Sequence, residues 1–195
     1  LLESEDAAPA HLLANKLNRH TFWCGQSGSG KTYALGVALE QIMLHTRLPL
    51  VILDPNSDYV KLGELHESAP ASEASELAQR DIRVLRSTPG AENPLHVRFM
   101  QLPLRSRAAI LQIDPLLHPQ DFNALLRLEP ELSLVPDHDI VGFMRAHPDR
   151  VRHDLAMRLE NLGVVQWNLW AWGKRAVTDD IDDKPDATVV DLGGF

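Results

Sequence analysis

The feature that most restricts the fold of this chain is the pattern G-x-x-x-x-G-K-T at residues 25–32. It comprises Gly25, Gln26, Ser27, Gly28, Ser29, Gly30, Lys31 and Thr32. Glycines let the backbone bend so that successive N–H groups face inward and hold phosphate oxygens. The ammonium of Lys31 can reach the β- and γ-phosphates, and the hydroxyl of Thr32 can ligate Mg²⁺. The pattern therefore predicts a binding site for ATP and Mg²⁺.

The surroundings of this loop suit a strand before it and a helix after it. Residues 21–24 read Thr-Phe-Trp-Cys, which is typical of a short buried strand, and we expect Cys24 to be a small buried side chain. Residues 32–45 place apolar side chains on one helical face. The alternative, a Gly/Ser-rich loop that binds nothing, does not account for this context.

A second strand is predicted at residues 50–53, which form a continuous apolar run before Asp54. Ligands of open α/β sheets bind at the carboxyl ends of strands, so Asp54 is expected near the phosphates if its strand neighbours the first. Two interpretations of Asp54 and Asp58 stay open. Either these acids hold the metal or orient the attacking water, or Asp54 ends a strand and Asp58 caps a short helix.

The two segments together resemble the HerA branch of the HerA/FtsK ATPases. The resemblance rests on residues 20–32, HTFWCGQSGSGKT, and residues 51–59, VILDPNSDY. Members of that branch typically carry T-G-S-G-K-[ST] and D-P-H-G-E-Y. Here Ser27 replaces Thr, Asn56 and Ser57 replace His and Gly, and Asp58 replaces Glu. The resemblance implies a RecA-like core and a hexameric motor that hydrolyses ATP and pulls double-stranded DNA, with a neighbouring arginine completing each site.

The last residues predict another strand of the parallel sheet, residues 187–190 before Asp191. By pattern alone, Asp191 could be the Walker B acid that holds Mg²⁺. In HerA-like proteins, however, a strand ending in a similar D-L-S-G-L precedes the Walker B strand, and we favour that interpretation. The true Walker B acid, a catalytic Glu and the arginines are then expected beyond Phe195. Because the chain also opens without Met, we expect a fragment of a longer protein.

The middle of the chain predicts a helical insertion over residues 104–175. Helices are expected at residues 72–78, 105–113, 119–128, 139–146 and 148–162, and strands at residues 82–85 and 96–99. Residues 1–17 are predicted to be a lead-in segment, and residues 18–195 the N-terminal part of a P-loop ATPase domain. The fold class is therefore α/β, a mainly parallel sheet flanked by helices.

Several charged and aromatic groups have more than one interpretation. Arginines 83, 86, 98, 105 and 107 are read first as solvated or ion-paired, and second as a nucleic-acid track. Tryptophans 167, 170 and 172 suit packing, a subunit interface or base stacking. The acidic residues 179–183 are predicted to form a solvated loop. The pairs His138-Asp139 and His153-Asp154 lack the spacing of a metal site.

Composition narrows the function further. The net charge of −8 does not indicate a protein that coats nucleic acid through general basicity, but it leaves open a local basic loop or an oligomer with a basic pore. One cysteine excludes an intramolecular disulfide. Neither a membrane-length apolar run nor a secretory signal is present in these residues, so we expect the cytoplasm. Two alternatives to a DNA motor stay open. One is a nucleotide-switched assembly ATPase of a secretion or defence complex, and the other is an ABC-type ATPase, whose L-S-G-G-Q signature is absent.

Overall fold

The computed structural model describes residues 11, 13, 16, 17, 19–67, 69–134 and 139–194. Its sheet has three parallel strands in the order β1–β3–β2. Their bounds are Leu50–Asp54 for β1, Ile82–Arg86 for β2 and Ala187–Asp191 for β3. All positions of β3 are buried, as expected for a central strand of a parallel sheet. The predicted α/β class is confirmed.

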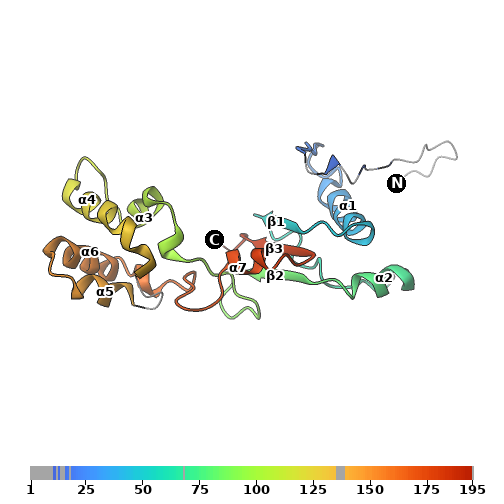
Figure 1. The fold of residues 1–195 in the computed structure, drawn as a ribbon. Helices are drawn as coiled ribbons and strands as arrows, with labels where there is room; N and C mark the ends of the chain where they lie inside the picture. The colour runs from blue at the N-terminus through green and yellow to red at the C-terminus, as the bar shows by residue number, and fades with distance from the viewer. Residues whose placement is uncertain are drawn as a thin grey trace.

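Three helices accompany the sheet (Figure 1). Helix α1, Lys31–His45, lies beside β1, α2 spans Ala71–Leu77 before β2, and the short α7, Val177–Asp182, leads into β3. The predicted helices at residues 32–45 and 72–78 are thus confirmed. Since β1 is followed by α2 and β2, parallel pairing is reached through crossovers, which the α/β pattern requires.

The remaining helices form a separate group, here called the helical body, at residues 99–172 (Figure 1). Its helices are α3 Leu104–Ile110, α4 Pro119–Leu128, α5 Ile140–Ala146 and α6 Arg150–Asn161, joined by 3-10 turns at Phe99–Gln101, Glu129–Leu134 and Val164–Gln166. Asp139 and Asp149 accept N–H groups of Gly142 and Val151 at the starts of α5 and α6. Side-chain caps of this kind define where helices begin, and the four predicted helices are confirmed.

The helical body is attached to the sheet by two chain segments that lie side by side. The N–H of Val97 donates to Leu169 and the N–H of Ala171 donates to Val97, at 2.8 and 2.9 Å. The N–H of Val177 donates to the carbonyl of His96 at 2.8 Å. The chain therefore enters and leaves the helical body at one place.

The strand predicted before the loop is wrong as far as the described residues go. Residues 21–24 form no strand and pair with none of the described strands, and Phe22 and Trp23 are 90% and 43% exposed. Cys24, expected to be buried, is exposed. Strand propensity expresses packing against neighbouring strands. Within the described part of the chain no strand lies beside β1 on the edge away from β3.

Two further predictions need correction. Residues 96–99 form no strand but an isolated bridge between Val97 and Trp170, followed by a 3-10 turn. Residues 179–183, predicted to be a solvated loop, lie largely in α7. Here Asp179 pairs with Arg98, while Asp180 and Asp183 both pair with Arg83. These arginines supply the charge that makes an acidic helix stable.

The lead-in predicted at residues 1–17 falls mostly outside the described residues, as do His138 and Phe195. None of the helices that are described combines the length and the apolar character needed to cross a membrane.

Candidate functional site

The glycine-rich loop sits at the amino end of α1 and needs glycine for two different reasons. Gly28 and Gly30 have φ of 75° and 79°, in the left-handed region that favours glycine. A Cβ on Gly25 would instead lie 2.7 Å from Ser29 Oγ and 2.9 Å from Lys31 Cγ. The loop thus combines special backbone angles with a close crossing by Lys31.

The amino end of α1 fits an anion. Its N-cap is Gly30, which supplies no side-chain acceptor, and its first turn holds no acidic residue. The first N–H groups and the positive end of the helix dipole therefore lack a negative side chain. Lys31 Nζ donates to the carbonyl of Gln26 at 2.8 Å and so crosses the loop. These donors suit the phosphates of a nucleotide.

Asp54 ends β1 and organises the turn that follows. It is 1% exposed and accepts N–H groups from Asp58 at 3.0 Å and Tyr59 at 2.7 Å, with a longer contact of 3.4 Å from Asn56. Ser57 in this turn has φ of 60°. The carboxylate of Asp54 therefore stabilises a tight polar turn, whereas Asp58 is exposed. Residues 59–62 form turns, so Asp58 caps no helix.

Tyr59 brings this turn against the loop helix. Its hydroxyl donates to the carbonyl of Thr32 at 3.4 Å, and its ring lies beside Gly36. Burial raises the pKa of the Tyr59 phenol, and the charges of Asp58 and Asp54 raise it further. The structure thus places the end of β1 beside the first turns of α1, with the protonated phenol as the contact.

Asp191 lies at the end of β3, in register with Asp54 on one side and Arg86 on the other. It is 2% exposed and accepts from Ser57 Oγ at 2.7 Å, from Gly193 N at 3.0 Å and from Arg86 Nε at 3.4 Å. Burial raises its pKa, but these hydrogen bonds outweigh burial and hold the pKa below the usual range. Asp191 is therefore an ionised carboxylate whose oxygens bind protein groups.

Three residues of this site were not assigned a role from the sequence: Ser57, Tyr59 and Arg86. Ser57 stands where HerA-like proteins usually carry Gly, and its hydroxyl binds Asp191. Gly193 gives a matching signal, because a Cβ there would collide with Ser57. Arg86 belonged to the scattered arginines, and only the register of β2 beside β3 brings it to Asp191.

The scattered arginines are mostly ion-paired, as the first interpretation predicted. Arg83, Arg86 and Arg98 pair with acids of α7 or β3. Arg107 is 1% exposed and pairs with Glu129 inside the helical body. Guanidinium groups engaged in this way have less to offer a phosphate backbone, so these residues form no nucleic-acid track by themselves.

The three tryptophans behave differently from one another. Trp170 is 3% exposed, its indole Nε1 donates to Val164 at 2.6 Å, and its ring meets Phe99 edge-to-face. Trp172 donates to Val165 at 3.1 Å. Packing is therefore the role of these two rings, whereas Trp167 is stacked on Trp170 and still 44% exposed.

Two described members of the histidine–aspartate pairs, His153 and Asp139, bind protein groups. His153 Nε2 lies 2.7 Å from the carbonyl of His147, and Asp139 caps α5. Across the described ranges, no three side chains of His, Cys, Asp or Glu are grouped to hold a metal ion.

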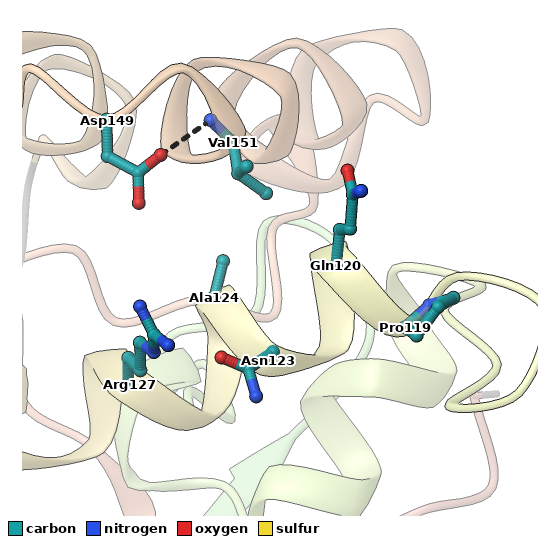
Figure 2. Close-up of a pocket in the computed structure, with 7 residues that line it drawn as sticks. All are labelled: Pro119, Gln120, Asn123, Ala124, Arg127, Asp149 and Val151. Atoms are coloured by element: carbon teal, nitrogen blue, oxygen red, sulfur yellow. Dashed lines mark hydrogen bonds between the residues drawn. The ribbon is translucent and has the colours of Figure 1, made fainter.

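A hollow of about 380 Å³ lies in the helical body between α4 and the start of α6 (Figure 2). Arg127 of α4 and Asp149, the N-cap of α6, face it. The Asp149 carboxylate caps α6, because it accepts a hydrogen bond from the N–H of Val151 at 3.0 Å. Its lining residues come from the helical body alone, so it is no part of the nucleotide loop.

Together, the α/β fold and a glycine–lysine loop opening a helix define the class of P-loop nucleotide-binding proteins. The chain belongs to the family described as Helicase HerA, central domain, whose model matches residues 1–129. The match includes the loop, the Asp54 turn and α4, and it places the chain among ATPases of the HerA/FtsK type. A comparison with curated proteins gave no match. A comparison with solved structures gave none either.

Proposed function

We propose that this protein binds ATP on residues 25–32 and hydrolyses it with Mg²⁺. The observation that carries the proposal is the amino end of α1, which has no side-chain cap and where Lys31 reaches across the loop to Gln26. Membership of the HerA family supports it. The backbone from Gln26 to Lys31 cradles the phosphates, and Lys31 neutralises charge that develops on the γ-phosphate. Thr32 Oγ1 would hold the metal ion, which would supply further neutralisation of the phosphate charge.

Of the two acids in the turn after β1, we propose that Asp58 rather than Asp54 assists in orienting the attacking water. The Asp54 carboxylate already accepts several backbone N–H groups, and the Asp191 carboxylate accepts from Ser57, Gly193 and Arg86. An acid engaged in this way loses those bonds if it turns toward water or metal. Asp58 is exposed at the same turn, so it can turn toward a nucleotide at no such cost.

We propose further that the hydrolysis drives movement on double-stranded DNA by a ring of copies of this chain. Support comes from family membership and from the resemblance of residues 20–32 and 51–59 to HerA motors. In such a ring, as in other P-loop motors, an arginine from the neighbouring copy completes each site.

The test is ATP hydrolysis by the full-length protein, with and without duplex DNA. Wild type is expected to turn over ATP faster with DNA, and Lys31→Ala is expected to lose turnover in both conditions. Lys61→Ala, an exposed lysine near the same turn, is the matched control and should retain turnover. Unchanged turnover in Lys31→Ala contradicts the proposed role of the loop.

A second candidate, an assembly switch that binds ATP without turnover, is favoured by one observation. Both buried acids at the carboxyl edge of the sheet are engaged in protein hydrogen bonds. Equilibrium binding of ATP together with undetectable turnover in wild type supports this candidate. An Asp58→Asn variant that binds ATP but has lost turnover supports hydrolysis instead.

A further inference from the structure

A second hollow, of about 380 Å³, lies between the segment after β2 and the tryptophan segment that closes the helical body. We call it the aromatic hollow. The lining residues used in the argument below are Arg86, Trp167, Asn168 and Lys174. It begins at the carboxyl end of β2, and neither the phosphate loop nor α1 contributes to its lining.

Trp167 gives this hollow a flat, rigid face. Its ring is parallel to that of Trp170 within 15°, with centroids 5.8 Å apart. Trp170 is itself fixed by its bond to Val164 and by Phe99, so the stack has a buried anchor. Since Trp167 is still 44% exposed, its ring is available to a further planar group.

The polar lining is cationic and neutral. No aspartate or glutamate lines the hollow, whereas Arg86 and Lys174 do, in a chain with a net charge of −8. Arg86 reaches Asp191 through Nε alone.

We propose that the aromatic hollow binds an unpaired nucleic-acid base, stacked on Trp167, with the adjoining phosphate at Lys174. An aromatic side chain of a peptide also stacks on tryptophan, but it carries no negative charge for the cations of the lining to bind. A nucleotide matches the flat ring, the polar groups and the cations of the lining. Its base stacks on the ring, the edge of the base bonds to groups such as the Asn168 amide, and its phosphate binds the positive charge. The choice of nucleic acid as occupant rests on the proposed function.

The hollow also touches the network around the nucleotide loop. Arg86, which lines it, binds Asp191, and Asp191 accepts from Ser57 in the turn that carries Tyr59. Tyr59 in turn contacts Thr32. The lining of the hollow at Arg86 is therefore joined to the loop by consecutive polar contacts.

The test is binding of the full-length protein to a fluorescein-labelled oligo-dT strand, measured by anisotropy. Trp167→Ala is expected to weaken binding about tenfold, because stacking of one base on a tryptophan is lost. Trp167→Phe should retain most of the affinity, because a ring is still present. Met157→Ala, which removes a similarly exposed apolar side chain from α6, is the control. Equal affinities of wild type and Trp167→Ala overturn the proposal.

Photo-cross-linking separates the occupants directly. With 5-bromodeoxyuridine in the strand, the cross-linked peptide is expected to contain residues 165–174. Cross-links confined to other peptides, or displacement of the strand by a tryptophan-rich peptide but not by unlabelled oligo-dT, overturn the proposal. ATP turnover without DNA should be equal in Trp167→Ala and wild type. If Trp167→Ala loses strand binding but keeps its ATP turnover, the result supports the base site in the aromatic hollow. If the wild-type protein shows no ATP turnover, the result contradicts the proposed hydrolysis and leaves the test of strand binding unaffected.

Discussion

The helical body and the sheet region differ in how completely they bury their apolar side chains. The helical body has a cluster of 15 buried hydrophobic residues, while the largest buried cluster at the sheet has three, Leu85, Leu95 and Val190. Strand β1 leaves Val51 and Leu53 49% and 67% exposed. Burial is the main source of stability. The helical body therefore holds itself together, whereas the loop region depends more on polar contacts and on what it binds.

The largest expected effect comes from breaking the core of the helical body. Leu159→Ala removes a side chain with 0% exposure and is expected to reduce the free energy of unfolding by about 2–5 kcal/mol. Urea denaturation followed by circular dichroism measures this change. Leu116→Ala, at 87% exposure, is the control and should change stability by less than about 0.5 kcal/mol. If Leu159→Ala changes the free energy of unfolding only slightly, the core of the helical body does not contribute the stability that its burial predicts.

Nucleotide is expected to stabilise the other region selectively. At a concentration of 100 times its Kd, ATP with Mg²⁺ adds about 2.7 kcal/mol of stability to the state that binds it. Hydrogen exchange measured by mass spectrometry should therefore slow in α1 and in the Asp54 turn more than in α5 and α6. Lys31→Ala should abolish the protection. Equal slowing of all helices contradicts the contrast between the two regions.

The polar contacts at the end of the sheet are expected to have a smaller effect. Ser57→Ala removes the 2.7 Å hydrogen bond to the buried Asp191 carboxylate and should cost about 1.5–3 kcal/mol. The cost should fall at acid pH, because Asp191 has a depressed pKa and loses its charge as the pH falls. Ser106→Ala, an exposed serine of α3, is the control. A pH-independent cost would show that the charge of Asp191 is not involved.

The smallest expected effect concerns the ion pair between Arg98, just before the helical body, and Asp179 of α7. The guanidinium of Arg98 and the N–H of Ala176 lower the pKa of Asp179 to about 2. This pair therefore stabilises the fold fully above the ordinary pKa of 3.8, and its contribution is lost as the pH falls through about 2. Asp179→Asn should cost about 0.2–1 kcal/mol at pH 7, because the pair is partly exposed. Melting curves from pH 7 to pH 2 should converge for the variant and wild type.

Periodicity predicted the helical body well, because its helices carry apolar stripes and because α5 and α6 begin at side-chain caps. Residues 119–128 were assigned with the bounds that α4 has. The strand expected at residues 21–24 is absent, because an apolar pattern does not show whether a neighbouring strand is present to pair with it. The solvated loop expected at residues 179–183 is wrong for a similar reason, because the arginines that pair with these acids, Arg83 and Arg98, lie far away in the sequence. Pairing between distant segments is invisible to local patterns.

The candidate site also has one part that a local sequence pattern predicts and one part that depends on distant segments. The loop was predictable because its glycines and Lys31 act within one short segment. The roles of Asp54 and Asp191 were not, because they depend on backbone N–H groups, on Ser57 and on the register of Arg86. The sequence predicted the donors to phosphate but not which acids are already in use.

The bond from Val177 to His96 has a consequence for the modularity of the chain. Because the two junctions are in contact, everything between them has the topology of a long loop closed at its base. A short turn joining His96 to Val177 could replace the helical body without lengthening any connection in the sheet. Helices can thus be added, removed or exchanged at this point of the fold while the nucleotide loop keeps its supporting strands.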